Sequence, residues 1–159
     1  MTVLVPMEQH EFEDFRRSSV NQFARSSIKA GLCDDDDALS FAENQFSRLL
    51  PNGIDTPGHY ISNIVCPDNG DAVGVMWFAV EPQGRNGCAY VYDISVSEKH
   101  RRQGYAQQAF AEMESIVRTL GMNRIDLHVF AWNAGAIELY KKMGFEVTGM
   151  NMTRRLDKP

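Results

Sequence analysis

The hydrophobic positions of this chain recur with two different periods, which divide it into helical and extended segments. In the first third of the chain the apolar side chains return every three or four positions, as on the buried face of an amphipathic helix. This pattern predicts a helix over 12–28 that stops at Gly31. It predicts a second helix over 39–50 that stops at the Pro-Asn-Gly segment 51–53.

Extended segments follow, and their composition favours a sheet. Segment 72–81 is almost wholly apolar, which is typical of a central strand buried on both faces. The Asn69-Gly70 pair just before it favours a hairpin turn. Segment 125–129 alternates apolar and polar residues and so has one apolar face. The predicted strands, in chain order, are 2–5, 60–66, 72–81, 88–96, 125–129 and 145–152.

Two further helices are interleaved with the later strands. Apolar residues step by three and four over 106–120, and Gly121 closes that helix. Asn133 can cap a shorter helix over 133–143. No repeat, linker or low-complexity segment interrupts the chain. One continuous α/β domain over 1–159 is therefore the simplest organisation.

Composition and charge exclude several classes of function. At 159 residues the chain is long enough for one domain with a proper core, and its formal net charge of −5 argues against a general nucleic-acid binder. No apolar run approaches the ~20 residues of a membrane span, and the apolar start of the chain is too short for a signal peptide. We therefore expect a cytoplasmic protein that binds neither membranes nor nucleic acid.

The residue types that bind metals lack the spacing of a metal site. Cys33, Cys66 and Cys88 are widely spaced and form no C-x-x-C pair or Cys/His cluster, so three reduced thiols are expected. The acidic run 34–37 could bind a cation, but cap and first-turn carboxylates of the helix over 39–50 explain it better. We expect no metal.

Residues 101–106 read Arg-Arg-Gln-Gly-Tyr-Ala and join the strand 88–96 to the following helix. A turn that leads from a strand into a helix N-terminus leaves backbone N–H groups without partners, and the helix dipole places positive charge there. Arg101 and Arg102 add donors suited to phosphate oxygens. The turn predicts a site for a phosphate-bearing ligand, although a permissive Gly104 beside two solvated arginines would give the same sequence.

Two sequence blocks resemble the GCN5-related N-acetyltransferase (GNAT) superfamily, the acetyl-CoA-dependent transferases. The first is Asp93-Ile94-Ser95-Val96 and, four residues later, the turn 101–106, which fits the family's turn of Gln or Arg, two residues, Gly, one residue, and Gly or Ala. Arg102 and Ala106 stand where the family often has glycine. The second block comprises Leu127-His128-Val129, Asn133, Ala136, Leu139-Tyr140 and Gly144-Phe145.

This resemblance implies an architecture for the whole chain. We expect a single GNAT-type domain over 1–159, with a mixed, mostly antiparallel sheet of about six to seven strands flanked by about four helices. We expect an acetyl-CoA-binding core over 88–152 and a variable acceptor side over 1–87.

The resemblance also implies the cofactor-binding residues. Acetyl-CoA is expected as the co-substrate. The backbone of Ile94, Ser95 and Val96 is expected to pair with the pantetheine amides, and Asn133 to hold the pantetheine arm or a water as well as to cap its helix. The residues expected at the pyrophosphate are Arg101, Arg102, Gln103, Gly104, Tyr105 and Ala106.

Acetyl transfer to an amine needs a base and benefits from an acid. A free alkyl ammonium has a pKa near ~10.4, so a base must remove a proton near neutral pH. Tyr140 is the expected acid for the leaving thiolate, since tyrosine titrates near ~10 and a thiol near ~8.5; the alternative for Tyr140 is a core aromatic. The candidate bases, in order, are His128, Asp93 and Glu81, and each could instead be a satisfied polar residue.

The resemblance implies an N-acetyltransferase that acts on a primary amine by direct attack on acetyl-CoA. The acceptor would be a small-molecule amine, or a peptide N-terminus or lysine as for a protein N-terminal or ribosomal-protein acetyltransferase. The alternative from another class is a non-catalytic acyl-CoA-binding regulatory module, which would need neither Tyr140 nor a base. The hydrophobic last strand could pair two copies into a homodimer.

Overall fold

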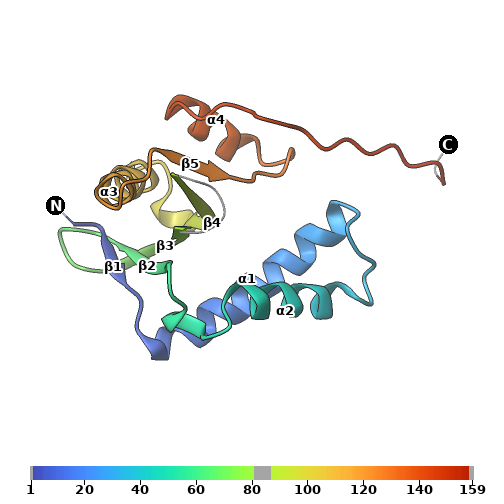
Figure 1. Cartoon of the computed structure of the whole chain (residues 1–159), viewed down its shortest axis with the longest axis horizontal. Coiled ribbons are helices and arrows are strands. Elements are labelled where there is room, and N and C mark those ends of the chain that lie inside the picture. The colour runs from blue at the N-terminus through green and yellow to red at the C-terminus, as the bar shows by residue number, and fades with distance from the viewer. Residues whose placement is uncertain (1, 81–86, 158–159) are drawn as a thin grey trace. The chain divides into compact units, whose positions relative to one another are not determined.

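A five-stranded sheet is the framework of the part of the chain that the structure describes (Figure 1). The computed structural model describes residues 2–80 and 87–157, and the chain forms two compact units, Met1–His128 and Val129–Pro159. Neighbouring strands follow the order β1-β2-β3-β4-β5 and are antiparallel, except that β4 and β5 are parallel. The bounds are β1 (Leu4–Pro6), β2 (His59–Val65), β3 (Ala72–Val80), β4 (Cys88–Val96) and β5 (Arg124–Leu127).

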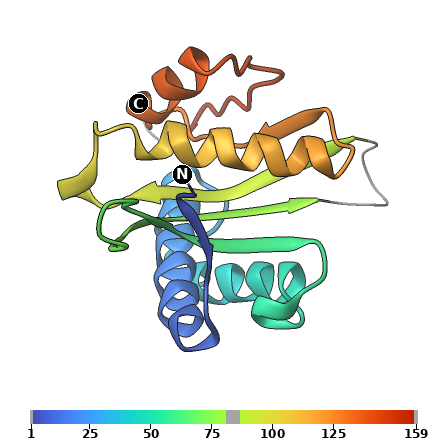
Figure 2. The same ribbon diagram turned by 90° about the vertical axis from the view of Figure 1, so that its left-hand side faces the viewer.

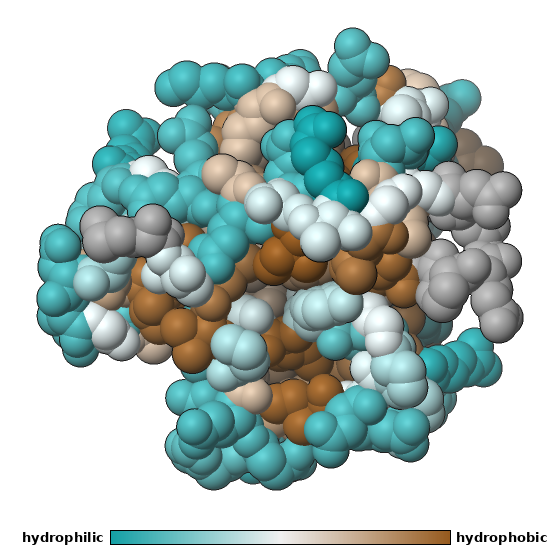
Figure 3. All heavy atoms as spheres, turned by 60° about the vertical axis from the view of Figure 1, so that its left-hand side comes forward, coloured by the Kyte–Doolittle hydropathy of each residue, from teal (hydrophilic) through white to brown (hydrophobic). Residues whose placement is uncertain are grey.

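Helices cover both faces of this sheet within the first unit (Figure 2). α1 and α2 pack against each other on one face, and α3 lies on the other face against β3 and β4. At the lower edge of Figure 3, the outer side of the α1–α2 pair is mainly hydrophilic, as expected of amphipathic helices. The helices are α1 (Gln9–Lys29), α2 (Ala38–Leu49), α3 (Tyr105–Thr119) and, in the second unit, α4 (Ala134–Lys142), with short 3-10 turns η1 (Gly53–Asp55) and η2 (Glu98–His100).

Aromatic side chains form the core between the α1–α2 pair and the sheet. Phe12 and Phe15 of α1 and Phe46 of α2 are buried together with Trp77 of β3, and the ring centroids of Phe46 and Trp77 lie 5.4 Å apart. The indole N–H of Trp77 donates a hydrogen bond to Nδ1 of His59 at 3.0 Å, so this large ring is buried with its polar atom paired. Burial of each such ring contributes about 1.5–3 kcal/mol and holds α1 on the sheet.

β4 carries a β-bulge opposite β3. The register of the two strands shifts by one residue beyond the pair Trp77 and Asp93, because Phe78 lies opposite Val91 and no residue of β3 is assigned opposite Tyr92. Because of the extra residue, two consecutive side chains of β4 face the α1 side of the sheet. Tyr92 stacks on Trp77 with a centroid distance of 4.7 Å, and Asp93 accepts a hydrogen bond from Ser19 of α1.

A close approach of β3 to β4 lies two residue pairs beyond the bulge. A Cβ atom on Gly74 would collide with the carbonyl oxygen of Ser95, the residue opposite Val75. Only glycine therefore allows this spacing. β3 thus packs closely against the backbone of β4 just before the turn that follows Val96.

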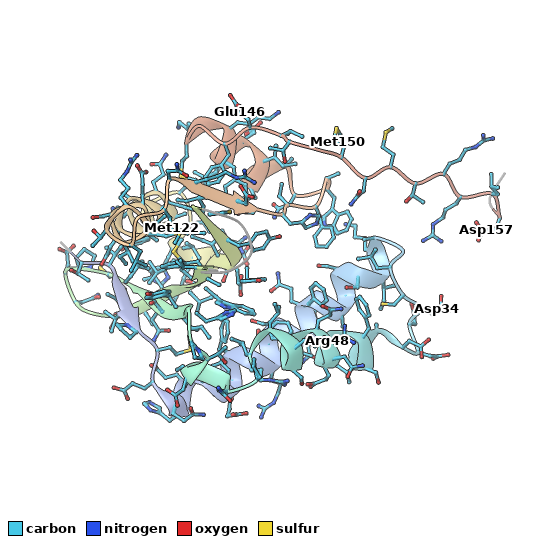
Figure 4. The ribbon with its side chains drawn as sticks, in the orientation of Figure 1. Asp34, Arg48, Met122, Glu146, Met150 and Asp157 are labelled. Carbon is cyan, nitrogen blue, oxygen red and sulfur yellow. The ribbon has the colours of Figure 1, made fainter. Side chains whose placement is uncertain are left out.

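The expected fold class is confirmed, with one correction. The described residues form five strands rather than about six to seven, because the predicted strand over 145–152 is not formed. A strand requires a second strand with which to pair, and no described strand pairs with this segment; Val147 and Met150 are 65% and 79% exposed. Figure 4 shows Met150 and Asp157 on the extended segment that follows α4.

The first strand is tied to the opposite side of the sheet by one carboxylate. Oε2 of Glu112, on α3, accepts hydrogen bonds from the backbone N–H groups of Val3 at 2.7 Å and Leu4 at 3.0 Å. Leu4 begins the edge strand β1 and Val3 directly precedes it, and β2 is the one strand that pairs with β1 in the described sheet. Glu112 therefore supplies hydrogen bonds that no strand provides.

Replacing Glu112 with alanine should reduce the free energy of unfolding by about 1–3 kcal/mol, because two backbone donors lose a charged acceptor. Glu114→Ala is the matched control on the same helix. Glu114 pairs only with exposed Arg118, so its loss should cost less than ~0.5 kcal/mol. Urea unfolding measures both, and equal losses would contradict a special role for Glu112.

Candidate functional site

The edge of β4 that faces β5 is paired over only part of its length. The last residue pair between these strands is Val91 with Leu127. From Tyr92 to Val96, β4 pairs with β3 alone in the described part of the sheet. Backbone groups on that edge are consequently available to a ligand. The segment includes Ile94, Ser95 and Val96, the residues expected at the pantetheine arm.

The turn after β4 has the backbone shape of an anion site. Arg102 has φ 63° and Gly104 has φ 84°, so two residues of the turn lie in the left-handed region, and α3 begins directly afterwards at Tyr105. The first backbone hydrogen bond of α3 runs from Gln108 to Gly104, which leaves the preceding N–H groups of the first turn without intrahelical partners. Unpaired N–H groups at a helix N-terminus are suited to an anion, and this is the site expected from the sequence.

Arg102 has a left-handed backbone conformation at a position where the family pattern often has glycine. The family often has glycine at this position, and a left-handed conformation costs a non-glycine residue roughly 1–2 kcal/mol. The left-handed conformation of Arg102 has this cost, and the residue places a second guanidinium group at the turn. Arg102 and Arg101 are both exposed.

Hydrogen bonds fix the side chains around the turn. Nε of Arg101 donates to the carbonyl oxygen of Val96 at 3.0 Å, and Nε2 of Gln103 donates to the carbonyl oxygen of Lys99 at 3.3 Å. The first of these bonds anchors the Arg101 side chain to the end of β4. A hydrogen bond from Tyr105 lowers the pKa of the Cys66 thiol, which places the turn between β2 and β3 beside the start of α3. The sequence gave no sign of this contact.

Asp93 is a titratable group in an unusual environment. The β-bulge turns its carboxyl group toward α1, where Ser19 Oγ donates a hydrogen bond to Oδ2 at 3.4 Å. The carboxyl group is largely buried, and this burial raises its pKa to about 6, while the bond from Ser19 opposes the rise. A carboxyl group with this pKa is ionised at neutral pH and can still accept a proton efficiently.

A cavity of about 350 Å³ lies between α1 and the sheet, and Asp93 forms part of its wall. The wall combines polar residues of α1 with residues from the same face of β2 and β4. It includes Glu11, Asp14, Ser19, Asn63, Asp93 and Ser95. The expected acceptor side, 1–87, supplies most of this wall, although the sequence did not single out Glu11 or Asn63.

Glu11 is held at the cavity by two hydrogen bonds. Its Oε2 accepts from the backbone N–H of Glu8 at 2.9 Å, which completes a capping box at the start of α1, and from Nδ2 of Asn63 at 3.0 Å. The bond from Glu8 lowers the pKa of Glu11 most; slight burial opposes it, and the Asn63 amide adds to the lowering. The helix-cap pattern of the sequence could have identified Glu11, but not its contact with β2.

The other predicted catalytic residues occupy different places. His128 follows the end of β5 and is exposed. In the second unit, Asn133 caps α4, since its Oδ1 accepts from the backbone N–H of Ala136 at 3.4 Å. Tyr140 of the same helix packs edge-on against Phe145, with ring centroids 5.7 Å apart. Glu81 lies outside the described residues.

The described residues show neither a metal-binding cluster nor a membrane-spanning helix. They contain no group of three or more His, Cys, Asp and Glu side chains arranged to hold a metal ion. No described helix is long and apolar enough to cross a membrane. Cys33, Cys66 and Cys88 are not joined in disulfides.

Comparison with known proteins identifies the family. The model of the acetyltransferase (GNAT) family matches residues 21–145, and the chain belongs to this family. It is 34% identical to YycN, an uncharacterized N-acetyltransferase of Bacillus subtilis, over 98% of this chain and 100% of that protein. It is 36% identical to YdgE, a second uncharacterized N-acetyltransferase of that bacterium, over 96% of this chain and 97% of that protein.

Solved structures agree with this assignment. The crystal structure of YycN from Bacillus subtilis matches with a TM-score of 0.89 and 33% identity, over 96% of this chain and 97% of that one. AAC(6')-Iy, solved in complex with the bisubstrate analogue CoA-S-monomethyl-acetylneamine, matches with a TM-score of 0.60 over 96% of this chain and 95% of that one. Its identity is 18%, so this second likeness shows the fold alone.

Replacing Asp93 with asparagine should stabilise the protein above about pH 6. The folded state binds the Asp93 proton more tightly than the unfolded state, so stability falls as pH rises from ~4 through about 6. The variant avoids this loss, and its free energy of unfolding should be higher by about 1–3 kcal/mol at ~pH 8 and nearly unchanged at ~pH 4.

Urea unfolding at both pH values measures this difference. Asp36→Asn is the control, because Asp36 is exposed and its replacement should change stability by less than ~0.5 kcal/mol at either pH. An equal gain for Asp93→Asn at both pH values would show that burial of its charge is not the cause.

Proposed function

We propose that this chain is an N-acetyltransferase that transfers the acetyl group of acetyl-CoA to a primary amine by direct attack. The observation that carries the proposal is the position of Asp93. Its carboxyl group lines a cavity on one side, and it directly precedes Ile94, Ser95 and Val96, whose edge on the β5 side is not paired with another strand among the described residues. A proton acceptor thus lies beside a strand edge suited to an extended amide-bearing ligand.

Acetyl-CoA would bind along the end of β4 and at the turn that follows. Backbone groups of Ile94, Ser95 and Val96 on this edge would pair with the pantetheine amides, as an added strand pairs with a sheet edge; the carbonyl oxygen of Val96 already accepts from Nε of Arg101. The pyrophosphate would lie at the N-terminus of α3, where unpaired N–H groups, Arg101 and Arg102 supply donors and positive charge. AAC(6')-Iy, which shares the fold, was solved with a CoA conjugate, and this is in keeping with a CoA ligand for the present chain.

The amine would reach the thioester from the cavity side. As its nitrogen bonds to the carbonyl carbon, Asp93 accepts the proton that the nitrogen loses, and a backbone N–H of β4 stabilises the oxyanion. Collapse of the tetrahedral intermediate breaks the C–S bond. The thiolate of CoA leaves and takes a proton from Tyr140, the acid that the family resemblance implies.

We rank Asp93 above His128 as the candidate base, in the reverse of the order expected from the sequence. His128 is exposed and lies beyond the end of β5, whereas Asp93 is partly buried and lines the cavity. A buried carboxyl group that titrates near neutral pH is a stronger candidate for a general base. We therefore place Asp93 before His128.

Arg101→Glu should weaken CoA binding at least about 30-fold, because a carboxylate would face the pyrophosphate and the donors of the guanidinium would be lost. Isothermal titration calorimetry with CoA measures the dissociation constant. Arg48→Glu on α2 reverses an exposed charge on a different helix and should leave the constant unchanged. Unaltered affinity in Arg101→Glu would remove the turn from the proposed site.

Asp93→Asn should lower kcat about 10²–10⁴-fold while the affinity for CoA stays the same, because the base is lost and the strand edge is kept. In the unaltered protein, kcat should fall below about pH 6, where Asp93 becomes protonated. This limb should vanish from the residual activity of the variant.

The matched variant is His128→Gln, assayed for thiol release across the same pH range. We expect its kcat to stay within about tenfold of the original and its acidic limb to remain. Loss of the limb in His128→Gln and its persistence in Asp93→Asn would make His128 the base.

A further inference from the structure

The cavity between α1 and the sheet carries acidic groups and no basic ones. Its lining residues include Glu11, Asp14 and Asp93, and no lysine, arginine or histidine is among the described lining residues. Asp93 contributes a largely buried carboxyl group whose Oδ1 has no hydrogen-bond partner in the described structure. A carboxylate oxygen without a hydrogen-bond partner at a cavity wall can accept from a ligand, and a cationic donor is the strongest.

The carboxylates of Glu11 and Asp93 are held at different points of this cavity. Glu11 is fixed through Asn63 of β2, and Asp93 is fixed through Ser19 of α1. In Glu11, both hydrogen bonds go to Oε2, so Oε1 remains without one among the described residues. Each carboxylate therefore presents one oxygen that is free to bind a ligand.

The distance between these two points follows independently from the helix and from the sheet. Glu11 and Ser19 are eight residues apart on α1, and eight residues at 1.5 Å each give about 12 Å. On the sheet, Asn63 pairs with Val75 and Val75 with Ser95, two residues beyond Asp93. Two strand spacings and two residues along the strand also give about 12 Å.

Apolar residues share the wall with the two carboxylates. Met7, Phe15 and Val75 line the same cavity. Methylene groups are stabilised by such a wall, whereas a ligand carboxylate would be repelled by Glu11, Asp14 and Asp93. This combination selects against amino acids and favours a cation with an aliphatic chain.

We propose that the acceptor is an extended aliphatic diamine or polyamine, with Asp93 at the amine that reacts and Glu11 at the distal ammonium group. This inference rests on the proposed acetyl transfer. What it adds is a role for the second carboxylate of the cavity. Glu11 acts as a specificity residue that selects acceptors by their length and charge. Asp14, which is exposed and beside Arg17, lies at the outer part of the same wall.

The test compares acceptors of one chemical series in the Glu11→Gln variant. A glutamine side chain can still accept the hydrogen bonds from Glu8 and Asn63 and preserve the capping box, so α1 should remain folded. The acceptors are diaminoalkanes from diaminopropane to diaminodecane, spermidine, and hexylamine as a monoamine. Glu13→Gln, an exposed position on the same helix that is absent from the described cavity wall, is the matched control.

In the unaltered protein, kcat/KM should rise with diamine length and exceed that of hexylamine. In Glu11→Gln, KM for the long diamines and spermidine should rise about tenfold or more, while kcat, KM for acetyl-CoA and KM for hexylamine stay unchanged. Glu13→Gln should match the unaltered protein. A purely structural role for Glu11 would instead change KM for monoamine and diamine alike, which would overturn the proposal.

Direct binding of diaminodecane, measured by calorimetry, separates this inference from the proposed function. If diaminodecane binds, binds more weakly to Glu11→Gln, and is not acetylated, the result would support the diamine site in the cavity and refute the proposed acetyltransferase activity. Acetyl transfer to hexylamine as efficient as transfer to the diamines would support the enzyme and overturn the cavity's selectivity. The inference would also be overturned if the protein neither bound the diamines nor acetylated them.

Discussion

The extra residue in β4 is the constraint on which the candidate site depends. An ideal strand alternates its side chains, so Tyr92 and Asp93 would face opposite sides of the sheet. The bulge places both toward α1, where Tyr92 joins the aromatic core and Asp93 reaches Ser19 and the cavity. One irregularity in the pairing thus joins the packing of the core to the placement of a carboxyl group.

Burial of Asp93 has opposite effects on the stability of the fold and on the proposed chemistry. The surroundings that raise its pKa to about 6 also make its ionised form costly. A glutamate or aspartate on the surface would cost nothing and would be a weaker proton acceptor at neutral pH. The aromatic core around Trp77 and the tie between Glu112 and β1 supply stability that offsets this cost.

Periodicity predicted the described helices and the inner strands well, because one face of each element is buried. It failed at 145–152, where an apolar segment has no neighbouring strand in register. The turn at Arg101 and Gly104 was identifiable because backbone chemistry there depends on few residues. The bulge at Tyr92 was not, since only the register against β3 defines it. Glu11 and Asn63 meet across distant parts of the chain, and no local pattern records such a contact.

The stacked rings beside the bulge also give the molecule a built-in optical reporter. Trp77 is one of two tryptophans in the sequence, and it is 2% exposed while Trp132 is 42% exposed. Their emission should therefore differ in wavelength, with the Trp77 signal at the shorter end. Because Trp77 pairs with Asp93 across β3 and β4 and contacts Tyr92, its fluorescence reads the charge and occupancy of the neighbouring cavity without any added label.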